Sequence, residues 1–195
     1  MKEPFFYRFI AKPLIFIYTK IALRPKIIGI EYIPKTGRVV LAGNHTNNLD
    51  SVMIAAINKR VVHFLAKDSL LKGPKKLIFK NMGIIPVNRS IHDKDALSKA
   101  IDALNNEMVI GIFPEGTVNK TEKIILPFKI GAVKMASITS SQIVPFVITG
   151  SYKLFNNNLC IEFLNPIKIP KSTDLTEYNE KLMSIISEKL KEKRK

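Results

Sequence analysis

Apolar runs alternate with helical patterns along most of the chain. The runs are rich in Val and Ile and predict strands; they are "RVVLAGN", "VVHFLAK", "GIIPVNRS", "MVIGIF", "IVPFVITG" and "LCIEFLNPIKI". Between them, residues 51–59, 92–107 and 129–139 predict helices, and in the second of these Ala96, Ala100 and Leu104 share one helical face. Strands separated by helices favour an α/β fold, with a mixed, largely parallel sheet flanked by helices.

Residues 1–25 predict a pair of short amphipathic helices divided at Pro13. The segment is dense in Phe, Ile, Leu and Tyr, but basic residues such as Arg8 and Lys20 interrupt it. No window therefore approaches the ~20 apolar residues needed to cross a bilayer. Apolar side chains on one face and basic ones on the other are typical of helices that lie in a membrane interface. A helix pair packed on the protein's own core would show the same pattern.

Residues 26–195 predict a single further domain. A chain of 195 residues can form one sizeable core, and it contains no internal repeat or low-complexity tract. The last segment, from Asp174 onward, continues as an amphipathic helix. The single cysteine, Cys160, cannot form an intramolecular disulfide, and its strand-like surroundings favour a small buried side chain over a nucleophile.

The charge is strongly positive, with 31 Lys and Arg against 16 Asp and Glu and a net charge of +15. Such a surplus favours an anionic partner, which means nucleic acid or an acidic membrane surface. A lysine-rich surface that serves only solubility has the same composition. No nucleic-acid-binding module or basic-aromatic β-platform is recognisable, so the membrane is favoured.

Polar clusters directly follow three of the predicted strands. They are His45 to Asp50, Asn88 to Ser90 and Pro114 to Thr117. Ligands of open α/β sheets gather at the carboxyl ends of the strands, where loops meet helix N-termini. We therefore expect the three clusters to converge on one pocket.

The first cluster, "GNHTNNLDS", contains a histidine and an aspartate that could act together. A neutral imidazole at His45 could take a proton from a hydroxyl, provided that Asp50 accepts the proton on its other ring nitrogen and so sets its tautomer. Alternatively, Asp50 could be the N-cap of the following helix in an ordinary polar turn. His63 lies inside a strand-like run and is expected to be structural.

No nucleophile of the protein's own accompanies this pair. The sequence lacks a G-x-S-x-G elbow, zinc-ligand spacing and a phosphate-binding G-x-x-x-x-G-K-[ST] loop. A His-Asp pair without a nucleophile has to activate the hydroxyl of a substrate. The pattern therefore indicates direct group transfer onto an alcohol.

The other two clusters contain groups suited to an anionic ligand. Arg89 ends an apolar run, and its guanidinium could bind two phosphate oxygens, although an ordinary surface arginine fits the same position. In "IFPEGTV", Gly116 allows a close approach of the backbone, while Glu115 and Thr117 supply an acceptor and a hydroxyl. A plain Pro-Glu-Gly turn is the alternative.

Together these stretches resemble the glycerolipid acyltransferases typified by 1-acylglycerol-3-phosphate O-acyltransferase (lysophosphatidate acyltransferase). The family's H-x-x-x-x-D box corresponds to His45 and Asp50, and its second box to the run that ends in Arg89. Its F-P-E-G-T box is present in full at residues 113–117, and its apolar V-P segment resembles "IVPFVITG". The four boxes occur in the family's order, and the similarity covers about residues 28–168.

The resemblance implies transfer of a fatty acyl group from an acyl thioester to the hydroxyl of 1-acylglycerol-3-phosphate, giving phosphatidic acid in phospholipid synthesis. It implies that His45 is the general base and that Asp50 orients it and stabilises the imidazolium. The acceptor headgroup would be positioned by Lys67, Arg89, Glu115, Gly116 and Thr117. No metal or cofactor is implied beyond the acyl donor, which is either coenzyme A or acyl carrier protein.

The implied partners are an anionic membrane surface, a lysophospholipid acceptor and, where it is the donor, acyl carrier protein, with no nucleic acid. The implied location is the cytoplasmic face of a membrane, as a peripheral or monotopic protein. One position departs from the family, because Val118 replaces the arginine that usually follows F-P-E-G-T and helps to hold the acceptor's phosphate. Lys120, Lys123 or Lys129 could compensate.

Two alternatives therefore stay open. An enzyme of the same fold could act on another lysolipid or an aminoacyl lipid, which Val118 favours. A non-catalytic membrane-surface binding protein could use the same scaffold, although the intact His45 and Asp50 argue against it.

Overall fold

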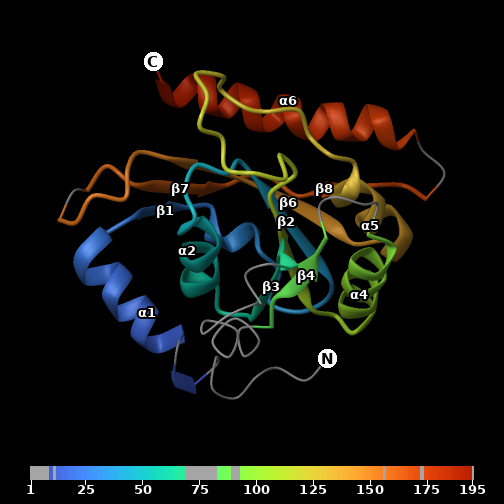
Figure 1. Cartoon of the computed structure of the whole chain (residues 1–195), viewed down its shortest axis with the longest axis horizontal. Coiled ribbons are helices and arrows are strands. Elements are labelled where there is room, and N and C mark those ends of the chain that lie inside the picture. Colours follow the sequence, from blue (N-terminus) through green and yellow to red (C-terminus); the bar gives the residue numbers. More distant parts are fainter. Residues whose placement is uncertain are drawn as a thin grey trace.

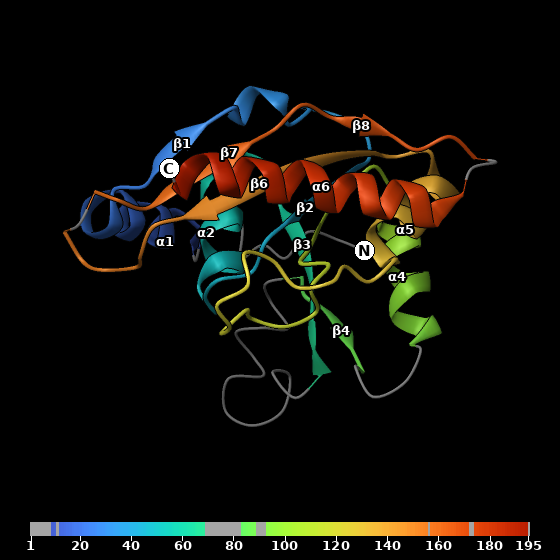
Figure 2. The same ribbon diagram turned by 90° about the horizontal axis from the view of Figure 1, so that it is seen from above.

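A β-sheet runs through the middle of the computed structural model, which describes residues 9–10, 12–68, 83–88, 93–155, 157–171 and 174–194. Within these residues the sheet has eight strands, and helices lie on both sides of it (Figures 1 and 2). The strands are β1 (Lys26–Ile28), β2 (Val39–Gly43), β3 (Val62–Lys67), β4 (Ile85–Val87), β5 (Val109–Ile112), β6 (Gln142–Thr149), β7 (Cys160–Phe163) and β8 (Ile167–Lys168). The helices are α1 (Lys12–Tyr18), α2 (Asp50–Ile57), α4 (Lys94–Asn105), α5 (Gly131–Thr139) and α6 (Leu175–Arg194), with short segments η2 (Thr19–Leu23) and η3 (Ile30–Tyr32).

The sheet is mixed and largely parallel. Its strand order is β1-β7-β6-β2-β5-β3-β4, and β8 pairs with β6. β2 lies between β6 and β5 and is parallel to both, so that Leu41 pairs with Val144 on one side and Gly111 on the other. β3 and β4 extend the parallel set, whereas β7 and β8 are antiparallel to β6. The fold class predicted from the sequence is confirmed.

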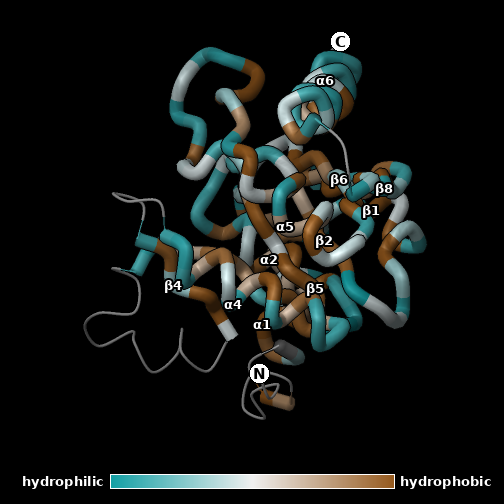
Figure 3. Tube along the Cα trace, turned by 90° about the vertical axis from the view of Figure 1, so that its right-hand side faces the viewer, coloured by the Kyte–Doolittle hydropathy of each residue, from teal (hydrophilic) through white to brown (hydrophobic). Residues whose placement is uncertain are grey.

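β2 is buried on both of its faces. Val39 and Leu41 belong to one core cluster, while Val40 and Ala42 belong to the other, as the alternation of side chains along a strand requires. Figure 3 shows the hydrophobic colours concentrated along the central strands. A strand that is covered on both faces has a continuous apolar sequence, which explains the composition of "RVVLAG".

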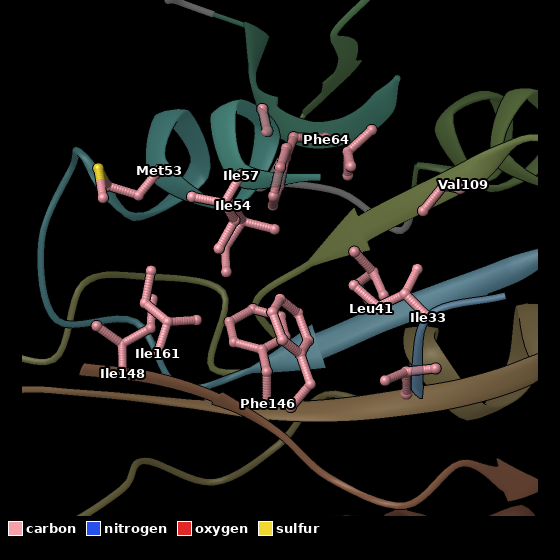
Figure 4. Packing of buried hydrophobic residues seen from close by; sticks show 14 of the residues in the cluster. Ile33, Leu41, Met53, Ile54, Ile57, Phe64, Val109, Phe146, Ile148 and Ile161 are labelled. Atoms are coloured by element: carbon pink, nitrogen blue, oxygen red, sulfur yellow. The ribbon is translucent and has the colours of Figure 1, made fainter. Parts of the chain in front are cut away.

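The two core clusters lie on opposite faces of the sheet. On one face, Met53 and Ile54 of α2 pack with Leu41 and Phe146 (Figure 4). On the other face, the apolar sides of α4, α5 and α6 contribute residues such as Leu104. Because helices bury apolar surface on both faces, the parallel strands can be apolar throughout while their loops remain free to carry polar groups.

The sequence pattern did not resolve every short strand, because some form through pairing with a neighbouring strand. Lys26–Ile28 forms β1, which the sequence pattern did not predict, since its residues are mostly exposed and become a strand through parallel pairing with β7. The final apolar run contains two strands, β7 and β8, that pair with different parts of β6. Cys160 begins β7 and is partly buried.

At the N-terminal end, α1 runs directly into the π-helical segment η2, which ends at Leu23 and is followed by Arg24. Leu14, Ile17 and Ile21 are exposed along this continuous helical stretch, whereas Leu23 packs into the core. Residues 1–8 and 11, which include most of the first predicted helical piece, lie outside the described residues. Among the helices that the structure describes, none combines the length and apolar composition needed to span a bilayer.

α6 is joined to the sheet by ion pairs as well as by apolar contacts. Lys189 Nζ lies 3.0 Å from one carboxylate oxygen of Glu162 in β7, and Lys193 Nζ lies 2.7 Å from the other. Burial acts to raise the pKa of Glu162, but the two lysines outweigh it and lower this pKa below its usual value. The charged form of Glu162 therefore stabilises the folded state.

Glu162→Gln should lower the free energy of unfolding by about 1 kcal/mol at neutral pH, because both ion pairs lose their anion. A carboxylate with a lowered folded-state pKa stabilises the fold fully above its unfolded-state pKa, and this contribution is lost as the pH falls through the folded-state value. Urea denaturation should therefore show the difference between variant and wild type shrinking as the pH falls below 4.5. A constant difference over this range would mean that Glu162 acts through packing alone.

Candidate active site

Loops from three neighbouring parallel strands meet at one edge of the sheet. β2 pairs with β5 and β6, and Ala42 lies level with Ile112 on one side and Pro145 on the other. The carboxyl ends of the three strands therefore lie together, at the edge where α/β sheets bind ligands. Two of the polar clusters predicted from the sequence, residues 45–50 and 114–117, do come together here.

His45 and Asp50 form a hydrogen-bonded pair. His45 Nδ1 lies 2.9 Å from Asp50 Oδ2, and the Asp50 side chain is fully buried at the start of α2. The same oxygen accepts hydrogen bonds from the backbone N–H groups of Thr46 at 2.6 Å and Asn47 at 2.8 Å. The carboxylate thus turns back into the preceding loop, and the alternative in which Asp50 caps α2 is wrong, since α2 has no side-chain cap.

Tyr152 is a third member of this cluster and comes from the loop after β6. Its hydroxyl donates to Asp50 Oδ1 at 2.5 Å. Burial, together with the neighbouring Asp50 charge, raises the pKa of Tyr152 above its usual value, so this hydroxyl stays protonated and acts as a donor. Sequence reasoning missed Tyr152, because its position after the "IVPFVITG" strand has meaning only once β6 is known to lie beside β2.

The plane of the His45 ring is set by aromatic packing. The ring stacks on Phe113 with centroids 4.0 Å apart and an interplanar angle of 7°. Phe113 in turn stacks on Phe64, with ring centroids 5.5 Å apart, and forms a T-shaped pair with Phe146, with centroids 5.9 Å apart. The His45 side chain is 12% exposed. Because Nδ1 donates its proton to the Asp50 carboxylate, Nε2 is left as the nitrogen that can accept a proton.

Glu115 connects two loops through its carboxylate. One oxygen accepts from the His45 backbone N–H at 2.7 Å, and the other accepts from the Leu126 N–H at 2.8 Å. Glu115 is buried, and burial raises its pKa despite these two bonds. The structure thus gives Glu115 a role in positioning the His45 backbone, while the acceptor-binding role implied by the sequence stays a prediction.

The rest of the Pro-Glu-Gly turn lies beside a lysine. Gly116 has a φ of 71°, which favours glycine, and a methyl group added there would lie 3.1 Å from Lys129 Nζ. The Lys129 backbone N–H also donates to the Pro114 carbonyl at 2.9 Å. Thr117 is exposed next to Gly116. The exposed Lys129 therefore lies across the turn at Gly116, two positions before Val118, which stands where an arginine was expected.

Lys67, another residue predicted from the sequence, lies further along the same edge. Lys67 is the exposed last residue of β3 and is in register with Val87 of β4. Arg89, two positions after Val87, lies outside the described residues, as does Ser90. His63 is buried within β3, where its Nδ1 is 2.8 Å from the Gly83 carbonyl oxygen, as expected of a structural histidine.

A pocket of about 250 Å³ borders this cluster. His45 and Glu115 are among the residues that line it, as are Lys123, Lys193 and Arg194. Basic side chains in the lining of a pocket suit a ligand that carries negative charge. Within the described residues, no group of His, Cys, Asp or Glu side chains has the arrangement of a metal site.

The sequence matches the family described as "Acyltransferase" over residues 24–149. It is similar to the 1-acyl-sn-glycerol-3-phosphate acyltransferase of Borreliella burgdorferi, with 33% identity over 176 residues, which cover 86% of this chain and 70% of that protein. The protein of the same name from Saccharomyces cerevisiae is 29% identical over 191 residues, 88% of this chain and 61% of the yeast protein. The chain thus spans less than two thirds of the yeast relative.

A solved structure also shares this fold. The crystal structure of the 1-acyl-sn-glycerophosphate acyltransferase from Thermotoga maritima matches with a TM-score of 0.77 at 20% sequence identity. The match covers 100% of this chain and 84% of the Thermotoga chain. At this identity the likeness concerns the arrangement of the sheet and its helices.

Glu115→Ala should lower the free energy of unfolding by about 3 kcal/mol, because two backbone N–H groups lose a charged acceptor. Urea denaturation measures this, and Glu122→Ala is the matched control, since Glu122 is an exposed glutamate of the same connection. The control should denature as the wild type does. Equal midpoints for both variants would show that the Glu115 carboxylate does not hold the two loops together.

Proposed function

The chain belongs to the acyltransferase family, and on that premise we propose that it transfers a fatty acyl group from an acyl thioester to the free hydroxyl of 1-acylglycerol-3-phosphate. The product is phosphatidic acid, which feeds phospholipid synthesis. The names of the Borreliella and yeast relatives support this acceptor. The observation that carries the proposal is the fixed His45 ring, which is bonded to buried Asp50 through Nδ1 and keeps Nε2 to accept a proton.

In the proposed reaction, His45 Nε2 removes the proton of the acceptor hydroxyl as its oxygen attacks the thioester carbonyl carbon. The new C–O bond gives a tetrahedral intermediate with an oxyanion. When this intermediate collapses, the C–S bond breaks and the imidazolium gives its proton to the departing sulfur. Asp50 stabilises the imidazolium by charge, and the donors of Thr46, Asn47 and Tyr152 keep Asp50 in place.

The acyl donor is proposed to be coenzyme A or acyl carrier protein, and no further cofactor takes part. Both donors are acidic, which suits a chain with a net charge of +15. Because the acceptor is a membrane lipid, the protein is proposed to act at the cytoplasmic face of a membrane with anionic lipids. The exposed apolar side chains of α1 and η2 support contact with that surface.

The headgroup phosphate is proposed to bind among cations near the Glu115-Gly116-Thr117 turn. Lys129 crosses this turn, and its Nζ can supply the charge that Val118 lacks. Lys67, at the end of β3, and Arg89 are proposed as further headgroup ligands. Val118 also favours a second candidate function, which is the same acyl transfer with another lysolipid or an aminoacyl lipid as acceptor.

His45→Ala should lower turnover by about 10²–10⁴-fold, because the general base is lost. Asp50→Asn should also impair turnover, since an amide cannot stabilise the imidazolium by charge. Release of free thiol from acyl-coenzyme A or acyl carrier protein, with lysophosphatidate present, measures the rate. Circular dichroism serves as the control for folding. A folded His45→Ala protein with wild-type turnover would rule out this mechanism.

Lys129→Ala should lower kcat/KM for lysophosphatidate by about tenfold or more, because a bond to a charged group is lost. The same variant should change kcat/KM little with 1-acylglycerol, which lacks the phosphate. Val118→Arg in the Lys129→Ala background should restore part of the loss, and Lys120→Ala is the control for an exposed lysine elsewhere on the loop. Equal losses with both acceptors would assign Lys129 to the fold or the donor.

A further inference from the structure

Two exposed apolar segments that are far apart in the sequence lie side by side. One is α1 with η2, where Leu14 is 62% and Ile21 59% exposed. The other is the tip of the β6–β7 loop, where Leu154 is 55% and Phe155 71% exposed. Figures 1 and 2 both show this loop beside the end of the N-terminal helical stretch. We refer to the two segments together as the apolar face.

A backbone hydrogen bond joins the two segments. The N–H of Phe155 donates to the carbonyl of Ala22 in η2 at 2.7 Å. Phe155 has a φ of 60°, in the left-handed region that bulky residues rarely adopt. The loop therefore holds a large aromatic side chain outward at its tip in an unfavourable backbone conformation, although turning it inward would bury apolar surface. Such strain at an exposed position is typical of a binding element.

Basic residues surround the apolar face. Lys20, Arg24 and Lys153 are exposed within or next to its two segments, and Lys20 Nζ lies 5.0 Å from the Phe16 ring centroid. Apolar side chains fringed by lysine and arginine match an anionic lipid surface, which offers hydrocarbon below its phosphates. A second copy of the chain would bring like charges together, and the net charge of +15 opposes that contact.

We propose that the β6–β7 loop tip, Leu154 and Phe155, is a membrane-contacting element that inserts into anionic lipid together with α1 and η2. The proposal rests on the proposed function in one respect, because a lipid acceptor is what makes a membrane the relevant surface. Tyr152, two residues before the tip, donates to the Asp50 carboxylate. The same loop therefore contacts the lipid surface and the catalytic pair, so it holds the site next to the membrane that contains the acceptor.

A single introduced tryptophan tests the contact directly, since the chain contains none. Phe155→Trp should show a blue-shifted emission on vesicles of phosphatidylserine and phosphatidylcholine, together with quenching by lipids brominated on their acyl chains. Ile138→Trp is the matched control, because Ile138 is 50% exposed on α5, which both views place on the opposite side of the molecule. The control should show neither effect. Emission of Phe155→Trp unchanged by vesicles would overturn the proposal.

A loss-of-contact variant separates this proposal from the proposed function. The double variant Leu154→Ser and Phe155→Ser should bind the same vesicles about tenfold or more weakly, because two apolar side chains no longer enter the lipid. Its acyl transfer to a short-chain, monomeric lysophosphatidate should stay within about twofold of the wild type, as for the control Ile138→Ser. Vesicle binding equal to wild type would overturn the loop's role. Absence of acyl transfer in the wild type would overturn the proposed function while leaving the binding result valid.

The oligomeric state provides an independent check. Sedimentation of the wild type without lipid should show a monomer, and the double variant should sediment identically. A wild-type dimer that the double variant dissociates would assign the apolar face to a second copy of the chain and overturn the proposal.

Discussion

The site depends on one fully buried carboxylate, that of Asp50, which requires donors on every side. Burying a charge is strongly unfavourable unless hydrogen bonds compensate for its lost hydration. The compensation comes from His45, from two backbone N–H groups of the loop after β2 and from the Tyr152 hydroxyl. These donors meet only because β2 and β6 are parallel neighbours whose carboxyl ends lie together. The fold and the chemistry are therefore linked through a single side chain.

The loop after β5 completes the arrangement from the other side of β2. Phe113 provides the surface on which the imidazole stacks, and Glu115 holds the backbone of His45. Both act on the orientation of His45. The Phe-Pro-Glu-Gly-Thr stretch thus positions the histidine through its first and third residues, while its exposed end lies beside Lys129.

The edge of the sheet that carries His45 and Asp50 lies close to the exposed apolar side chains. α1 packs near α2, whose first residue is Asp50, and the β6–β7 loop carries both Tyr152 and the exposed tip. The proposed lipid acceptor requires the base to reach the lipid–water boundary. Under the proposed membrane contact, the short segments shared by the reactive pair and the apolar face would bring His45 there.

The sequence by itself determined the alternation of strands and helices, the fold class, and the closeness of His45 to Asp50 along the chain, while the structure decided that Asp50 pairs with His45 and does not cap α2. All three are encoded locally, in the period of apolar residues or in two polar residues on one loop. Tertiary structure alone decided that Tyr152 donates a hydrogen bond to Asp50, which is 102 positions away in the sequence. It also decided that Glu115 accepts hydrogen bonds from two separate backbone segments and that Lys26–Ile28 is a strand. Each of these depends on which strands are neighbours in the sheet, and local spacing carries no information about strand order. The physical reason is that the free energy which selects the order comes from burying both faces of β2, a property of the whole core.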